Sequence, residues 1–218
     1  MLAAGLLCGL HKIERPMRAQ VLRARPRRRG LPKDRGERHA APVPPNLLDR
    51  QFAATRQNQK WVADFTYVWM AEGWLNVAVV IDLFSRRVVG WSMSSNVTAQ
   101  LVTDALVMAI WRRGRPLAVL HYSDRGSQYG SEQFQRPMAE LGVACLMSQS
   151  GNVCDNAAME SFFSSLKTER IRGRIYRSRN QARADVFDYI ERFYNPRRRH
   201  STVGYLSPTE FEALAEAS

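Results

Sequence analysis

The sequence predicts an α/β fold. Three consecutive segments are rich in β-branched and aromatic residues, which is typical of strands. The hydrophobic spacing then changes to that of helices, and short apolar runs alternate with amphipathic segments. Hydrophobic residues make up 45% of the 218 residues, which suits a packed core. The three cysteines form no CxxC pair and no apolar run is long enough for a bilayer, so a disulfide framework, a zinc site and a membrane protein are not supported.

The strand segments come in two groups. Residues 61–70, 74–83 and 87–93 are predicted to form a meander, in which the residues FSR turn the chain between the last two strands. Two shorter apolar runs, residues 117–122 and 143–148, are predicted to be buried strands. Tryptophans occur on these strands and on a helix, and we expect all five to belong to the core: Trp61, Trp69, Trp74, Trp91 and Trp111.

The helices are predicted from apolar residues spaced three and four apart. The first covers residues 98–112, with Thr98 as its N-cap. A short helix over 131–141 follows, and another begins at 155.

A last amphipathic helix is predicted over about 180–194 and ends at Pro196. Near the start of the chain, residues 11–22 look helical, but Pro16 should make that helix short or kinked. The buried face of the last helix is expected to consist of Ala182, Val186, Tyr189, Ile190 and Phe193.

The predicted element order is β-β-β-α-β-α-β-α-α. This order predicts a mixed five-stranded α/β sheet with flanking helices, of the ribonuclease H-like type, over about residues 58–175. Residues 1–57 would form a basic arm with a linker from residue 23, and residues 176–218 a helical C-terminal extension.

Charge is unevenly distributed along the chain. The net charge is +12, with +8 in residues 1–50, zero in 51–166, +7 in 167–199 and −3 in the remainder. A neutral central block is therefore flanked by two basic segments. This pattern predicts a soluble, cytoplasmic protein with a polyanionic partner, most simply nucleic acid.

Three carboxylates lie at positions that suggest a catalytic or metal-binding role. Asp64 interrupts a strand that is otherwise apolar, Asp124 follows a buried strand, and Glu160 lies on a helix beside its apolar stripe. At 100° per residue Lys167 lies only about 20° around the helix axis from Glu160, so both are expected on one face. Asp82 adjoins the FSRR turn and is expected to cap it.

Carboxylates from two strands and a helix can bind hard divalent cations, Mg²⁺ or Mn²⁺. Two such ions can activate an attacking oxygen and stabilise a leaving oxygen of a phosphodiester. Spacing by itself is weak evidence, since the 35 residues between Asp124 and Glu160 also separate Asp104 from Glu140. Scattered structural carboxylates are therefore the alternative at this point.

Longer sequence motifs help to choose between a metal-binding site and scattered structural carboxylates. They are similar to the integrase-type transposases of bacterial insertion sequences, the IS-three family, over about residues 44–213. The words that carry the resemblance are WVADFTYVW, VVIDLFSRRVVGW, HYSDRGSQY, SQSGNVCDNAAMESFFSSLKTE and RFYNPRRRHSTVGYLSPTEF.

The resemblance implies an integrase catalytic core with DDE-type polynucleotidyl transferase activity. The family's three catalytic and metal-binding acids would be Asp64, Asp124 and Glu160, and its DNA-contacting basic residue would be Lys167. Nicking at the element ends would expose a 3′-hydroxyl that attacks target DNA. A homo-oligomer on DNA and a nucleoid location are the corresponding expectations.

Several polar residues near these acids have two interpretations. Arg125, Gly126 and Gln128 form either a plain turn or, as the family word favours, the mouth of the site. Asn152 and Asn156 belong to a flexible turn or contact target DNA through their amides.

The C-terminal basic motif is also open to two interpretations. His200 either contacts phosphate together with Arg197, Arg198 and Arg199 or packs against the tail. Arg113 is a basic residue outside the proposed site, and we take it as a control position.

Only the end of the family's upstream helix-turn-helix is matched, by CGLHKIERPMRAQVLRARPRRRGLPKDRG. We therefore expect an N-terminally truncated copy or a start assigned too late. The leading hypothesis is a transposase that cleaves and joins DNA during insertion. The alternatives are a ribonuclease H-like nuclease, or a non-catalytic DNA-binding remnant that pairs with full-length transposase and inhibits it.

Overall fold

The computed structural model describes the chain over residues 9–21, 54–114, 120–123, 136, 139–140, 144–147 and 157–217. The chain divides into two units, Met1–Val43 and Pro44–Ser218. The first unit contains α1 (Leu10–Ala19), a ten-residue helix with Pro16 inside it. Most of the predicted linker and of the predicted helix at 131–141 lies outside the described residues. Within the described ranges, no helix is both long and apolar enough to cross a membrane.

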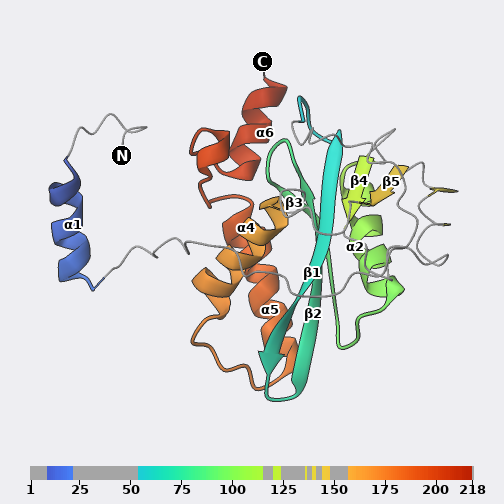
Figure 1. Cartoon of the computed structure of the whole chain (residues 1–218), viewed down its shortest axis with the longest axis horizontal. Coiled ribbons are helices and arrows are strands. Elements are labelled where there is room, and N and C mark those ends of the chain that lie inside the picture. Colours follow the sequence, from blue (N-terminus) through green and yellow to red (C-terminus); the bar gives the residue numbers. More distant parts are fainter. Residues whose placement is uncertain are drawn as a thin grey trace, which may run out of the picture. The chain divides into compact units, whose positions relative to one another are not determined.

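The second unit is built on one five-stranded sheet in the order β3-β2-β1-β4-β5 (Figure 1). Antiparallel pairing joins β1 (Lys60–Met70) to β2 (Gly73–Asp82) and β2 to β3 (Val88–Ser94). Parallel pairing joins β1 to β4 (Leu120–Ser123) and β4 to β5 (Ala144–Met147). The meander and the two later strands thus occur where the sequence predicts them.

Helices cover both faces of this sheet, as Figure 1 shows. One face packs against α2 (Ala99–Arg112), whose N-terminus is capped by Thr98: its Oγ1 accepts a hydrogen bond from the Leu101 N–H. The other face packs against α4 (Ala157–Ser165), α5 (Arg179–Asp188) and the π-helical segments that follow each of them, η3 (Leu166–Ile171) and η4 (Tyr189–Tyr194).

Alternation along β1 assigns its side chains to these two faces. Trp61 and Ala63 belong to the core cluster under α2, whereas Val62 and Val68 belong to the cluster with α4 and α5. Because successive strand residues point to opposite faces, even-numbered residues of β1 face α4 and α5.

The contact between β3 and α2 depends on a glycine. A Cβ atom at Gly90 would lie 2.1 Å from the carbonyl oxygen of Ala105 and 2.8 Å from the Cβ of Ala109. Both neighbours belong to a packed helix, and one of the clashing atoms is backbone. Only glycine allows β3 and α2 to approach this closely.

Gly90→Ala should therefore lower the free energy of unfolding by about 3 kcal/mol, the upper end for overpacking a core. The matched control is Gly173→Ala, where φ is +79° and nothing lies within 4 Å of the new Cβ. That control should cost about 1 kcal/mol, from backbone strain without a clash. Urea unfolding measures both, and equal losses would contradict the steric argument.

The buried face of the last helix differs from the prediction at one residue. Ala182, Val186, Tyr189 and Ile190 are buried as expected, but Phe193 is 40% exposed and Tyr194 only 3%. The helix is π-helical from Tyr189, and its wider turn moves the inward position one residue later.

The tryptophan prediction is right for Trp61, which is fully buried, and for Trp91, which packs at the edge of the core. It is wrong for three others. Trp69, Trp74 and Trp111 are 59%, 51% and 60% exposed. The first two lie where β1 and β2 run on beyond the short β4 (Figure 1), and Trp111 lies on the outer side of α2.

The C-terminal segment packs against the turn between β2 and β3. Its last helix, α6 (Pro208–Glu216), follows the short 3₁₀ helix η5 (Ser201–Val203) and begins with a capping box between Ser207 and Glu210. Phe211 packs on Phe84 with ring centroids 5.0 Å apart.

A buried polar cluster holds α6 in place. Glu212 is 3% exposed. It accepts hydrogen bonds from Ser85, from Arg87 and from both terminal nitrogens of Arg113, the latter at 2.7 and 2.9 Å. Asp82 caps the turn as predicted, since its Oδ1 accepts from the Phe84 N–H at 2.9 Å.

Candidate active site

Asp64 lies in the middle of β1, half-buried. Its Oδ1 accepts a hydrogen bond from the N–H of Phe65 at 2.8 Å. Strand alternation places Asp64 on the same face as Val62 and Val68, which pack in the cluster with α4. The carboxylate therefore lies on the face covered by α4 and α5, next to the end of the described parallel pairing between β1 and β4.

The described parallel ladder ends one residue before each of two predicted acids. The last described pair between β1 and β4 is Ala63 with Ser123. Asp64 follows Ala63, and Asp124 follows Ser123 in the sequence. Asp124 itself lies outside the described residues.

Glu160 lies on α4 and is exposed. Its neighbours in the helix, Met159 and Phe162, are buried in the cluster that also contains Val62 and Val68 of β1. The helix that carries Glu160 thus packs on the face of the sheet to which Asp64 belongs. The structure places these two predicted acids on the same side of the sheet.

Lys167 lies at the start of η3, directly after α4, and is exposed. Its Nζ lies 5.2 Å from the ring centroid of Tyr67, within cation–π range. Tyr67 is three residues after Asp64 on β1, so Lys167 connects the Glu160 helix to the Asp64 strand. Sequence reasoning missed Tyr67, although its place in the WVADFTYVW word was a usable signal.

Six predicted site residues lie outside the described residues: Asp124, Arg125, Gly126, Gln128, Asn152 and Asn156. Within the described part of the chain, no three His, Cys, Asp or Glu side chains group closely enough to hold a metal ion. The predicted metal ligands that the structure describes are Asp64 and Glu160, both hard oxygen donors suited to Mg²⁺ or Mn²⁺.

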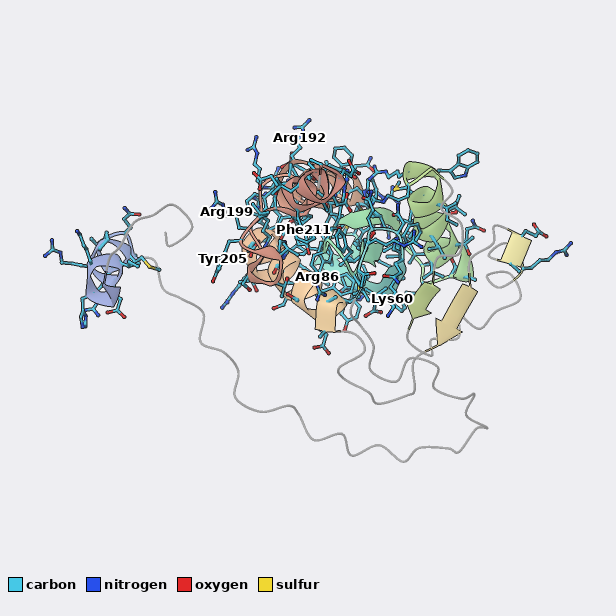
Figure 2. The ribbon with its side chains drawn as sticks, turned by 90° about the horizontal axis from the view of Figure 1, so that it is seen from above. Lys60, Arg86, Arg192, Arg199, Tyr205 and Phe211 are labelled. Atoms are coloured by element: carbon cyan, nitrogen blue, oxygen red, sulfur yellow. The ribbon has the colours of Figure 1, made fainter. Side chains whose placement is uncertain are left out.

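The three arginines of the C-terminal motif differ in their surroundings. Arg198 binds Glu169 of η3 through Nε and Nη2, at 2.8 to 3.1 Å, and Nη2 also donates to Ser165 Oγ at 2.9 Å. Arg197 and Arg199 are exposed, and Figure 2 shows Arg199 at the periphery of the C-terminal helices. The guanidinium of Arg198 is therefore engaged in holding the α4–η3 helix.

His200 packs within the protein. Its ring meets Tyr194 edge-on with centroids 5.0 Å apart, and its backbone pairs with Leu206. Burial, together with the charge of Arg198, lowers the pKa of His200 to about 4. An imidazole that is neutral at pH 7 favours the packing interpretation over a charged phosphate contact.

Arg113 proves unsuitable as a control position. Its side chain is 11% exposed and bonds to Glu212, Gln57 and Asn58. Truncation there would damage the fold. Arg192, whose side chain is 76% exposed and points away from the sheet in Figure 2, is a better reference for the general basic field.

Comparisons with known proteins define the class. Two family models described as "Integrase core domain" match residues 54–153 and 160–214. A chain of the simian T-cell lymphotropic virus intasome has a TM-score of 0.58 at 18% identity, over 73% of this chain and 55% of that one. The HTLV-2 integrase catalytic core, solved with magnesium, has a TM-score of 0.51 at 15% identity, over 73% of this chain and 99% of that one. The second unit has the ribonuclease H-like fold of an integrase catalytic core.

Curated relatives identify the family. Transposase InsF of insertion sequence IS3fB from Escherichia coli K12 is 48% identical over 210 residues, which cover 96% of this chain and 73% of the relative. A 31 kDa protein of the insertion element IS600 from Shigella sonnei is 38% identical over 207 residues, which cover 95% of this chain and 76% of the relative. The chain belongs to the IS3-family transposases with an integrase core domain, and is a DDE polynucleotidyl transferase.

Proposed function

We propose that Asp64, Asp124 and Glu160 form one metal-binding active site at which DNA is cleaved and joined. The observation that carries the proposal is the β1–β4 register, in which the residues directly before Asp64 and Asp124 are paired. The packing of the Glu160 helix on the Asp64 face of the sheet supports the third ligand. Three carboxylates from three elements suit two Mg²⁺ or Mn²⁺ ions.

Bound metal ions would supply Lewis-acid activation of the attacking oxygen and charge stabilisation of the leaving oxygen. The chain's own residues set the geometry. Asp64 is held by a rigid central strand, and Glu160 by a helix anchored through its buried neighbours Met159 and Phe162. In strand transfer a DNA 3′-hydroxyl forms a new P–O bond at the target phosphodiester while the old P–O bond breaks, so no external energy source is required.

The substrates in this proposal are the ends of the insertion element and the target DNA. Lys167 would hold a phosphate near the scissile one, and the exposed Arg197 and Arg199 would extend that contact. Arg125 would line the mouth of the site, and Asn152 and Asn156 would contact target DNA through their amide groups. Residues 1–57 would serve as a basic DNA-binding arm, residues 58–175 as the catalytic core and 176–218 as its helical extension.

We further propose that the protein acts as a homo-oligomer on DNA in the cytoplasm at the nucleoid. The test is an oligonucleotide assay with an element end, a target duplex and Mg²⁺ or Mn²⁺. Joined product supports the proposal. Cleavage without joining would instead identify a nuclease, and a mobility shift without either would identify a binding remnant.

Lys167→Ala should weaken binding to element-end DNA by about 1–2 kcal/mol, roughly 5- to 30-fold, because a charge-assisted phosphate contact is lost. Lys167→Arg should retain much of the affinity, since the charge is kept. The measurement is a titration at fixed salt, with Arg192→Ala as the control for loss of one exposed cation. Similar small losses of affinity for Lys167→Ala and Arg192→Ala would show that Lys167 contributes only to the overall positive charge of the protein and makes no specific phosphate contact.

A further inference from the structure

Three aromatic side chains are exposed together on the part of the β1–β2 hairpin that extends beyond β4. Tyr67, Trp69 and Trp74 are 57%, 59% and 51% exposed. Trp69 and Trp74 are direct cross-strand partners, and Tyr67 meets Trp74 edge-on with ring centroids 5.1 Å apart. We call these three residues the aromatic platform.

The strand that carries Tyr67 and Trp69 is anchored by the side chains on its other face. Val68 and Met70 alternate with Tyr67 and Trp69 along β1 and are buried in the core under α4 and α5. The strand is therefore fixed, and the rings, which have only two side-chain torsions each, lose little entropy when a ligand packs on them. Large aromatic residues exposed together on a rigid hairpin are typical of an interaction site.

Cationic side chains lie next to the platform. Lys167 Nζ lies 5.2 Å from the Tyr67 ring centroid. At the tip of the hairpin the N–H of Ala71 donates to the carbonyl of Tyr176 at 3.1 Å, which brings the exposed Arg177 to the same end. Arg179 Nη2 donates to the carbonyl of Glu72 at 3.0 Å, and its backbone N–H donates to the Glu72 carboxylate.

Aromatic rings beside cations match the chemistry of single-stranded nucleic acid. Every base has a flat face that can stack on Tyr or Trp, while lysine and arginine bind the phosphates. A paired duplex hides its base faces, so only unpaired nucleotides can use such a surface. The charge next to the rings favours this polyanion over an apolar protein partner.

The platform lies on the same strand as Asp64 but on the opposite face of the sheet, because side chains alternate along β1. Lys167, which follows α4 on the Asp64 side, has its Nζ 5.2 Å from the Tyr67 ring centroid, so side chains from the two faces meet at the part of β1 beyond its described pairing with β4. Tyr67 is three residues from Asp64, about 10 Å along an extended strand. We propose that Tyr67, Trp69 and Trp74 form a stacking site for unpaired nucleotides that flank the phosphodiester bound at Asp64. This inference rests on the proposed function for the position of the scissile bond.

The experiment compares two DNAs that differ only at one end: a fully paired element-end duplex, and the same duplex with three unpaired nucleotides. Binding of the full chain is measured by fluorescence anisotropy at fixed salt. The wild type should prefer the unpaired end. Trp74→Ala should reduce affinity for the unpaired end about 10-fold and leave affinity for the paired duplex within about 2-fold.

Trp111→Ala is the matched control, because Trp111 is equally exposed but lies on α2. It should leave the preference unchanged, and Trp74→Phe should retain most of it. Should Trp74→Ala fail to fold in a thermal melt, Trp69→Ala provides the same test and should show the same selective loss. Equal effects on both DNAs, or no preference in the wild type, would overturn the proposal. A change in oligomeric state on Trp74→Ala without a selective loss would also overturn it and identify a protein interface.

The two proposals fail in different ways. Asp64→Asn should lose joining but keep the Trp74-dependent preference for unpaired ends. If the wild type joins no DNA yet shows that preference, the proposed function fails while the stacking site stands. If it joins DNA without the preference, the stacking site alone is refuted.

Discussion

Asp64→Asn, Asp124→Asn and Glu160→Gln should each reduce strand joining by at least about 100-fold. Each change replaces a charged metal ligand by a neutral amide, and loss of several kcal/mol of charge stabilisation at the transition state corresponds to a reduction of this size. The measurement is the yield of joined oligonucleotide under single-turnover conditions. Thermal unfolding should change little, since Glu160 is exposed and Asp64 is only half-buried.

The matched control for these variants is Asp104→Asn. Asp104 is an exposed carboxylate on α2, the helix on the opposite face of the sheet, where it accepts a hydrogen bond from Gln100. Its loss should leave joining near the wild-type level. Near-wild-type joining by any one of the three acid variants would remove that residue from the proposed site.

Glu212→Ala should lower the free energy of unfolding by about 3–5 kcal/mol, the cost of leaving a buried charge without its partner. Arg113, with 11% of its side chain exposed, would lose both of its short contacts to the Glu212 carboxylate. Burial opposes ionisation of Glu212, but hydrogen bonds from Arg113 and Arg87 outweigh it and lower the pKa of this carboxyl.

Urea unfolding measures the effect of Glu212→Ala. Its control is Glu210→Ala, which removes an exposed member of the α6 capping box and should cost about 1 kcal/mol. Replacing both partners, Glu212→Leu with Arg113→Met, should recover only part of the stability. The unpaired Arg113 charge is removed, but the fully buried Asp82 loses its ion pair with Arg113 and keeps only its hydrogen bonds from the Asn58 and Phe84 N–H groups. A loss below about 1 kcal/mol for Glu212→Ala would show that α6 is held mainly by Phe211 and its apolar neighbours.

Contacts between distant parts of the chain escaped sequence-based prediction. Glu212 and Arg113 are 99 residues apart, and Arg198 and Glu169 are 29 apart. A charged side chain looks the same in a sequence whether it faces water or a buried partner. Arg198 was therefore grouped with its neighbours as a DNA contact, whereas its observed contacts hold the α4–η3 helix.

Features that depend on neighbouring residues could be predicted from the sequence. Three strands follow β-branched and aromatic runs and two follow short apolar runs. Thr98 caps α2, and Asp82 caps the turn between β2 and β3. Alternation along β1 was sufficient to put Asp64 on the same face as Val62 and Val68. Such features depend on bonds a few residues apart, which periodicity and residue type encode directly.

Which apolar residues are buried could be read only from the packing of the elements against one another. Trp61 and Trp69 belong to the same strand, yet the first is buried under α2 and the second is exposed, because β1 runs on past its covering elements. Likewise, the π-helical turn at the end of α5 buries Tyr194 in place of Phe193. Burial depends on what lies opposite a residue in space, and that is settled by the packing of whole elements.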